Sequence, residues 1–295
     1  MSRFFQLLKL MRIEQWIKNL FIFLPLFFSG ELLSVSRFTA CLVAFFGFGF
    51  IASSIYCLND IRDLESDKLH PQKKTRPLAN GKISKNMGIM TMITCFVLGI
   101  SIIFFLVKGH QTLILAFSLF YFVINILYSI RLKQVAIIDV TIIATGFVIR
   151  IFIGGAAADV YLSHWIVLMT FLLSLFIAFG KRRDDFTIYD RSGIVARQNI
   201  VHYNFDFLNA ALIITATITI MAYIMYTVSP EITARLQNNY VYTTSLFVLL
   251  GILRYLQITL VEKKSGNPTR LAVKDRFIRI SIIGWIAAFI LIMYI

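Results

Sequence analysis

The stretch Leu58-Asn-Asp-Ile-Arg-Asp-Leu-Glu-Ser-Asp-Lys-Leu-His-Pro-Gln-Lys-Lys-Thr-Arg-Pro-Leu-Ala-Asn-Gly81 concentrates four acids and five basic residues in a chain that is 58% hydrophobic. In a continuous helix, an arc of about 100° collects four oxygen-bearing side chains, those of Asn59, Asp60, Asp63 and Asp67. Glu65 points away from that arc. Clustered carboxylates repel each other unless a cation bridges them, and oxygen ligands suit Mg²⁺, which is usually shared with substrate phosphates. The stretch therefore predicts a magnesium and phosphate site, with a solvated charged loop as the alternative.

Runs of apolar residues place the rest of the chain in a membrane. Nine stretches of about 20 residues are long enough to cross a hydrocarbon core of about 30 Å. They cover residues 17–36, 38–58, 86–107, 111–130, 136–157, 161–180, 207–229, 239–261 and 277–295. The sequence predicts an all-α membrane protein, with residues 1–295 forming a single integral-membrane domain.

The basic residues predict its orientation. With the spans alternating, the N-terminus and the loops on its side of the membrane, long ones and the short 131–135 loop, carry 24 Lys and Arg, and the other side carries only Arg37, Lys108 and Arg235. Because cytoplasmic loops are enriched in Lys and Arg, we expect the N-terminus and these loops on the cytoplasmic side of the cell membrane and the C-terminus outside. This topology accounts for most of the net charge of +14, so no nucleic-acid partner is expected.

A second polar centre lies in the loop expected over residues 181–206. Five cations and three acids fall within residues 181–197, and Lys181, Arg182 and Arg183 stand where the sixth span meets the interface. This cluster is either a positive-inside anchor or, with the carboxylates of the 59–85 loop, part of a site for a polyanionic substrate. In the second case the two loops form a cap over the active site.

Charged residues inside spans are costly and mark candidate sites. Asp139 and Arg150 are eleven positions apart in the fifth span and share one helix face, about 16 Å apart along the axis. That spacing is too long for a direct ion pair, so both are expected to face the bundle interior or a wet cavity. Arg150 is a candidate phosphate-binding fork, and Asp139 could neutralise a loop cation.

Two weaker clusters flank the spans. Arg12, Gln15, Trp16 and Asn19 share a helix face before the first span, which fits an interfacial entry helix or a ligand contact. Tyr128, Ser129, Arg131 and Lys133 close the fourth span and are also typical of interfacial anchors. The four histidines lack the spacing of a metal site, and only His70 lies beside the carboxylate face.

The pattern Asn59-Asp60-x-x-Asp63-x-x-x-Asp67 resembles the first Asp-rich motif of the UbiA superfamily of intramembrane prenyltransferases. Nine spans, with polar loops after the second and sixth, also resemble that family over the whole chain. The resemblance implies a bundle of nine transmembrane helices around a central cavity, with Mg²⁺ as cofactor and Asn59, Asp60, Asp63 and Asp67 as its ligands.

Within this superfamily the chain resembles the polyprenyl-phosphate (decaprenyl-phosphate) phosphoribosyltransferase branch. The second Asp-x-x-x-Asp motif of aromatic prenyltransferases is absent, since Asp184, Asp185 and Asp190 do not have its spacing. The matches that carry the resemblance are Gln15-Trp16-x-Lys18-Asn19, His70-Pro71-x-Lys73-x-x-Arg76-Pro77, Tyr128-Ser129-x-x-x-Lys133, Asp139-Val140, Gly146-Phe147-Val148-x-Arg150 and Gly180-Lys181-Arg182.

This resemblance implies transfer of a 5-phosphoribosyl group from phosphoribosyl pyrophosphate to a polyprenyl phosphate lipid, a step in the biosynthesis of a cell-wall precursor. The Mg²⁺ ion binds the leaving pyrophosphate, and the ionised lipid phosphate needs no strong general base. The implied catalytic residues are Asp60, Asp63, Asp67 and Lys181. The implied substrate-binding residues are Gln15, Lys18, Asn19, His70, Lys73, Arg76, Tyr128, Lys133, Asp139, Arg150, Arg182, Arg183 and Asp185.

Two alternatives stay open. The first keeps the fold and transfers a prenyl group from a prenyl diphosphate to an aromatic or quinone-precursor acceptor. The second is a membrane transporter or lipid flippase, because charges in a polytopic bundle also line transport pathways. The polar residues concentrate on one side of the membrane and no inverted repeat is apparent, which favours an enzyme.

Overall fold

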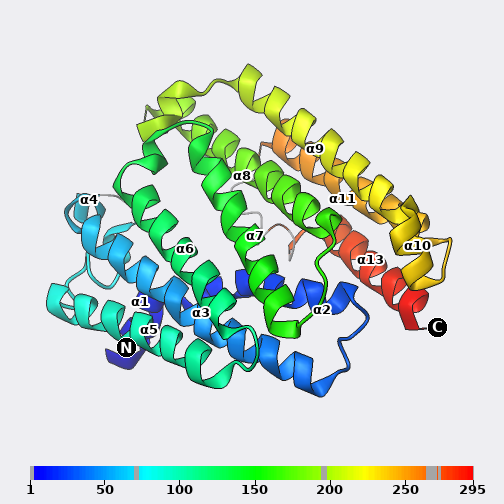
Figure 1. The fold of residues 1–295 in the computed structure, drawn as a ribbon. Helices are drawn as coiled ribbons and strands as arrows, with labels where there is room; N and C mark the ends of the chain where they lie inside the picture. The colour runs from blue at the N-terminus through cyan, green and yellow to red at the C-terminus, as the bar shows by residue number, and fades with distance from the viewer. Residues whose placement is uncertain (1–2, 70–72, 194–197, 264–270, 272–273, 295) are drawn as a thin grey trace. The chain divides into compact units, whose positions relative to one another are not determined.

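The computed structural model describes residues 3–69, 73–193, 198–263, 271 and 274–294, and within these ranges the regular elements are all helices (Figure 1). The first half contains α1 (Arg3–Met11), η1 (Ile13–Phe23), α2 (Leu24–Phe28), α3 (Val35–Arg62), α4 (Leu64–Leu69), η2 (Lys73–Thr75), α5 (Lys85–Leu106) and α6 (Gln111–Ile130). The second half contains η3 (Leu132–Gln134), α7 (Ile138–Ala158), α8 (His164–Ser192), η4 (Gln198–His202), α9 (Phe205–Val228), α10 (Pro230–Leu236), η5 (Val241–Thr244), α11 (Ser245–Gln257), η6 (Ile258–Glu262) and α13 (Arg276–Tyr294).

The helices form two compact units. Unit 1 consists of Met1–Arg131 and Gly146–Leu162, and unit 2 consists of Leu132–Thr145 and Ser163–Ile295, so α7 contributes to both. In unit 1, α3 and α5 pack closely because each presents a glycine. A Cβ added at Gly99 would lie 2.7 Å from the carbonyl oxygen of Gly47. Small residues at such a crossing let two membrane helices approach backbone to backbone.

Unit 2 is built around α8 and α9, with α11 and α13 beside them. Its core contains Phe176, Phe179, Leu208, Leu212 and Ile252, all buried. A Cβ added at Gly180 would lie 2.4 Å from the hydroxyl oxygen of Tyr255, so only glycine fits this contact between α8 and α11. The conformation of α8 at its polar end is therefore fixed by packing inside unit 2.

Eight helices in the described ranges are long and apolar enough to cross a membrane. The predicted number of nine spans is therefore not confirmed. The segment expected to span residues 17–36 consists instead of η1, a 3₁₀-helix of 11 residues, followed by the five residues of α2. At about 2 Å per residue in the first and about 1.5 Å in the second, this segment reaches about 30 Å, close to the thickness of a hydrocarbon core.

Two local expectations are wrong. α3 ends at Arg62 with Asp63 as its C-cap, and α4 begins at Leu64, so the Asp-rich stretch is two helices rather than one. Lys181–Asp190 do not lie in a loop, because α8 continues without a break to Ser192 and ends at Gly193 with φ +67°. Glycine adopts that left-handed conformation without strain and stops the helix.

Candidate active site

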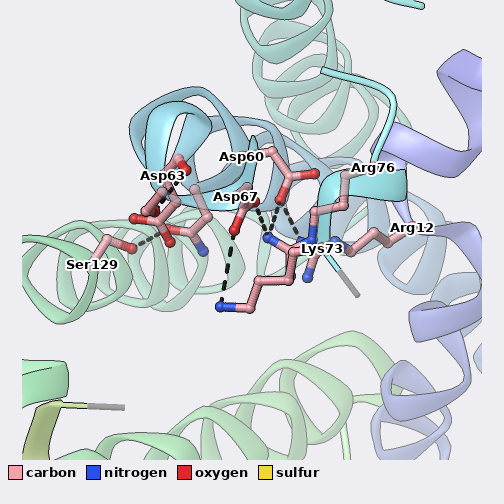
Figure 2. A network of polar contacts seen from close by, with 9 residues as sticks. Arg12, Asp60, Asp63, Asp67, Lys73, Arg76 and Ser129 are labelled. Atoms are coloured by element: carbon pink, nitrogen blue, oxygen red, sulfur yellow. Dashed lines mark hydrogen bonds and ion pairs between the residues drawn. The ribbon is translucent and has the colours of Figure 1, made fainter. Parts of the chain in front are cut away.

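The polar centre of unit 1 is built around Asp60, a buried carboxylate in the last turn of α3. Arg12, which lies between α1 and η1, places Nη2 2.5 Å from Asp60 Oδ1. Arg76 places Nη1 3.2 Å from the same oxygen, and Figure 2 shows both guanidinium groups pointing toward this carboxylate. Two cations from sequence-distant segments therefore neutralise one buried acid.

Asp67 is the second buried acid of this centre, and it comes from α4. Its Oδ2 lies 2.6 Å from Arg76 Nη1, and its Oδ1 lies 3.9 Å from Lys73 Nζ. Arg76 thus bridges the two carboxylates of Asp60 and Asp67 (Figure 2). The basic stretch after α4 folds back onto the acids, as expected if acids and cations serve one polyanionic ligand.

The remaining members of the Asp-rich motif lie at the end of α3. Asn59 accepts a hydrogen bond from the hydroxyl of Ser129 at the end of α6. Asp63 donates its backbone N–H to the carbonyl of Asn59 at 2.9 Å, and its own carbonyl accepts the N–H of Asp67 at 2.8 Å. Glu65 is exposed and pairs with Lys68 at 2.8 Å, away from the other acids as predicted.

The donor set of Asn59, Asp60, Asp63 and Asp67 consists of carboxylate and carboxamide oxygens, which suits a hard divalent cation. Within the described residues, however, no three acidic, histidine or cysteine side chains lie close enough to hold a metal ion together. Arg76 occupies the position between Asp60 and Asp67. The chemistry of the set fits Mg²⁺, and its assignment as a metal site stays a prediction.

The entry segment before the first membrane helices adopts a 3₁₀ geometry, in which side chains at i and i+3 eclipse. Its buried residues are accordingly Trp16, Asn19 and Ile22, whereas Gln15 and Lys18 are only partly buried. Trp16 donates Nε1–H to Ser53 at 3.0 Å. The predicted α-helical face with Gln15 is therefore replaced by a 3₁₀ face that docks onto the rest of unit 1.

Arg150 lies in the part of α7 that belongs to unit 1, and its side chain is 4% exposed. Its Nε donates to Asn19 Oδ1 at 2.9 Å, and its Nη1 donates to the Gly146 carbonyl at 2.6 Å. Its Nη2 lies 3.4 Å from the hydroxyl oxygen of Tyr121. The expectation that Arg150 faces the interior rather than lipid is confirmed.

Asp139 and Arg182 form the polar centre of unit 2, and neither side chain is exposed. Arg182 Nε lies 2.5 Å from Asp139 Oδ2, and Arg182 Nη1 lies 2.8 Å from Asp185 Oδ2. Tyr203 donates its hydroxyl to Asp139 Oδ1 at 3.1 Å and accepts the N–H of Ile137 at 2.7 Å. Burial raises the pKa of Tyr203 to about 12, so the hydroxyl keeps its proton and stays a donor.

The other two cations of the predicted cluster differ in their surroundings. Arg183 is buried, donating from Nε to Asn209 at 2.7 Å and from Nη1 to the Thr259 carbonyl at 2.5 Å. Lys181 is exposed on α8. Burial of Arg182 and Arg183 argues against a simple interfacial anchor, which would leave the guanidinium groups in water.

The other predicted site residues are less informative. Tyr128 and Lys133 are half-buried at the end of α6 and in η3, and His70 lies outside the described residues. The sequence did not predict that Arg12 pairs with Asp60, that Tyr203 holds Asp139, or that Tyr121 contacts Arg150. The sequence did place Arg12 on the predicted face of the entry helix, together with Asn19. The partners in all three contacts are at least 29 positions apart in sequence, so no local pattern could pair them.

Comparisons with known proteins show which family the chain resembles over its length. Residues 20–291 match the profile of the UbiA prenyltransferase family. The chain is 31% identical to decaprenyl-phosphate phosphoribosyltransferase of Mycolicibacterium smegmatis, over 95% of this chain and 90% of that one. It is 27% identical to the enzyme of the same name from Corynebacterium glutamicum, over 98% and 87%.

The fold is similar to that of solved structures. A UbiA homolog from Archaeoglobus fulgidus bound to DMAPP and Mg²⁺ superposes with a TM-score of 0.69 at 16% identity, covering 98% of this chain and 99% of that one. A structure of digeranylgeranylglyceryl phosphate synthase superposes with a TM-score of 0.66 at 18% identity, covering 99% and 98%. At such identities the likeness establishes the fold.

Proposed function

The chain belongs to the UbiA prenyltransferase family, and from this membership we propose that it is a polyprenyl-phosphate phosphoribosyltransferase. The donor is phosphoribosyl pyrophosphate and the acceptor is a polyprenyl phosphate lipid. An oxygen of the lipid phosphate forms a bond to C1 of the ribose, the bond from C1 to the pyrophosphate oxygen breaks, and pyrophosphate leaves with the electron pair.

One observation distinguishes this function from prenyl transfer. A second acidic motif on α8 would supply further metal ligands, but Asp185 is held by Arg182, which is itself fully buried against Asp139. The polar end of α8 therefore combines two buried guanidinium groups, Arg182 and Arg183, with the exposed Lys181, and its acids lack the Asp-x-x-x-Asp spacing of an aromatic prenyltransferase. Extra cations suit a reaction that brings together a diphosphate, a sugar phosphate and a lipid phosphate. The whole-length similarity to two decaprenyl-phosphate phosphoribosyltransferases supports the same choice.

We assign Asn59, Asp60, Asp63 and Asp67 to a Mg²⁺ ion, which when bound would stabilise the pyrophosphate as it leaves. Arg12 and Arg76 form ion pairs with Asp60, and Arg76 and Lys73 form ion pairs with Asp67. Because these cations already neutralise Asp60 and Asp67, they are positioned to bind phosphate oxygens once a metal ion takes over the carboxylates. Their pairing with the acids keeps the site close to neutral without a ligand.

The other assignments are contacts with phosphate or ribose. In unit 2 we assign an exposed phosphate contact to Lys181, with Arg182, Arg183 and Asp185 holding the polar end of α8 in place. Gln15, Lys18, His70, Tyr128 and Lys133 are retained as candidate substrate contacts. The orientation inferred from the basic loops places this site on the cytoplasmic side of the membrane. Phosphoribosyl pyrophosphate, which is water-soluble, would then reach the site from the cytoplasm.

A second function, transfer of a prenyl group from a prenyl diphosphate, is favoured by the fold shared with a homolog solved with DMAPP and Mg²⁺. A donor-swap assay separates the two. Purified protein with Mg²⁺ receives either phosphoribosyl pyrophosphate with a polyprenyl phosphate or a prenyl diphosphate with an aromatic acid, and products are identified by mass spectrometry. We expect a phosphoribosylated lipid from the first mixture only. A prenylated aromatic product would replace the proposed function with the alternative.

A further inference from the structure

Arg254 is a charged residue inside an apolar span of unit 2. It lies in the last turn of α11, within Val241–Glu262, a segment long enough to cross a membrane. Its Nη2 lies 2.8 Å from Asp275 Oδ2, and its Nη1 lies 2.9 Å from Glu262 Oε1 and donates to Gln257 Oε1 at 2.7 Å. A charge in such a segment is costly and marks a candidate site. These contacts hold the guanidinium in one place at the polar end of the helix.

A cavity of about 490 Å³ lies beside this guanidinium, between the end of α11 and the start of α13. Arg254 and two of its hydrogen-bond partners form the polar end of the cavity. Leu250, Leu253 and Phe277 form an apolar wall, and both Leu253 and Phe277 are half-exposed. A ligand that fills this cavity must therefore carry a polar group at one end and apolar surface at the other.

The apolar wall continues along α11 away from the charged end. Leu246, Leu250, Leu253 and Gln257 fall on one face of this helix, at i, i+4, i+7 and i+11, and Leu246 is exposed. From Leu246 to Gln257 the helix rises about 16 Å. Half of a hydrocarbon core of about 30 Å is about 15 Å. The face is therefore as long as an acyl chain that fills one leaflet of a bilayer.

The charges at the rim of the cavity are predominantly positive. Asp275 and Glu262 both pair with Arg254, so each of these acids already has a cationic partner. Lys274 and Arg276 are exposed and form no ion pair with another described residue, and Arg276 lines the cavity. Three cations against two acids leave a net positive charge, which attracts an anionic head group.

We propose that this groove between α11 and α13 binds one diacyl phospholipid with an anionic head group. The phosphate accepts hydrogen bonds from the guanidinium of Arg276 and from the amide N–H groups of Gln257, whose Oε1 is engaged by Arg254. One acyl chain lies along Leu253 and Leu250. Basic pockets between membrane helices bind acidic lipids in this way. The lipid site is additional to the proposed transfer reaction and does not rest on it.

Arg276→Gln and Leu253→Trp test the two parts of the site separately. The first variant removes a positive charge from the rim, and the second fills the space along the apolar wall. Both side chains are exposed, so neither change disturbs the core of unit 2. Arg191→Gln and Ile214→Trp place the same new side chains at exposed positions of α8 and α9, outside the cavity, and serve as controls.

The full-length protein is purified in detergent, freed of lipid and titrated with dioleoyl phosphatidylglycerol while its melting temperature is followed. We expect the lipid to stabilise the wild type, and native mass spectrometry to detect one retained lipid molecule. Arg276→Gln and Leu253→Trp should each weaken this binding at least about tenfold, whereas both control variants should bind as the wild type does. Dioleoyl phosphatidylcholine, which has no net charge, should bind the wild type at least about tenfold more weakly.

Three results would overturn the proposal. Equal binding of phosphatidylglycerol by the wild type, the site variants and the controls would reveal only a general attraction between basic surface and acidic lipid. Equal binding of both phospholipids would show that the charge of the head group is not recognised. Tighter binding of farnesyl monophosphate than of phosphatidylglycerol would assign the groove to an isoprenoid phosphate instead. These titrations measure no turnover, so failure of the proposed reaction would leave the lipid site standing.

Discussion

Asp139 and Arg182 form an ion pair in which neither side chain is exposed, although 43 positions separate them in sequence. The pair connects the start of α7 to the polar end of α8 within unit 2. Tyr203 and Asp185 supply further hydrogen bonds to the two partners. A buried pair held by these additional hydrogen bonds fixes the conformation of the segment that carries Lys181.

Breaking this pair should destabilise unit 2 strongly. Asp139→Asn leaves the Arg182 guanidinium buried without the carboxylate that its Nε contacts, and loss of one member of a buried ion pair typically costs about 3–5 kcal/mol. Asp185→Asn serves as the control, because Asp185 is 17% exposed and its loss leaves the Asp139 pair intact. Thermal unfolding in detergent should show the larger decrease for Asp139→Asn. Equal decreases would mean that the buried pair is not the main contact.

Asp63→Asn should abolish most turnover while leaving the fold intact. The substitution removes one carboxylate charge from the predicted metal ligands, and the C-cap hydrogen bond of Asp63 is made by its backbone N–H, which asparagine keeps. We expect kcat to fall by about a hundredfold or more, as for loss of a group that stabilises developing charge. Glu65→Gln is the matched control, because Glu65 is exposed and directed away from the other acids. Normal turnover by well-folded Asp63→Asn would refute its assignment to the metal.

Replacement of Arg76 should make the protein depend on magnesium for stability. Arg76 is the cation shared by Asp60 and Asp67, which are both buried. In Arg76→Gln these carboxylates repel each other unless a divalent ion joins them. The melting temperature of this variant should therefore rise more on adding Mg²⁺ after EDTA treatment than that of the wild type or of Lys74→Gln. An equal response in all three proteins would argue against a metal site at these acids.

Asp275 should contribute a stability that is lost in acid. A hydrogen bond from Arg254 lowers the pKa of Asp275, and Asp275 also accepts the N–H of Ile278 at the start of α13. Because the folded pKa is below the unfolded value, the contribution is present above about pH 4 and disappears as the pH falls through the folded pKa. Asp275→Asn should lower the melting temperature at neutral pH and reduce its decrease in acid. Asp190→Asn, at an exposed position, is the control; identical pH profiles for wild type and Asp275→Asn would contradict the assignment.

The sequence predicted the architecture well because membrane spans depend on local hydropathy. Long apolar runs gave α3, α5, α6, α7 and α9 close to their observed bounds, whereas α8 continues twelve residues beyond the predicted end of its span. The first segment was predicted less well, since its burial follows a 3₁₀ period that places Trp16, Asn19 and Ile22 on one face. An α-helical period of 3.6 residues would place Gln15 on the same face as Trp16 and Asn19. Packing within unit 1 selects the 3₁₀ geometry over the α-helical one.

The sequence predicted which residues belong to the candidate site, but not which of them contact each other. Clustering of acids with Arg76 was apparent from the spacing of the Asp-rich stretch, whereas the contact of Arg12 with Asp60 joins residues 48 positions apart. Arg182 was expected to lie in a loop as a phosphate clamp and instead lies inside α8. Partners from distant helices determine both outcomes, and no local pattern encodes them.

The most direct test of the proposed function is pyrophosphate release from phosphoribosyl pyrophosphate by the purified protein with Mg²⁺, measured with and without a long polyprenyl phosphate. We predict release only when the lipid phosphate is present, together with one phosphoribosylated lipid for each pyrophosphate. The lipid is the nucleophile in this scheme, so hydrolysis alone should be slow. Absence of lipid-dependent release from a folded, detergent-stable protein would contradict the assignment of donor and acceptor.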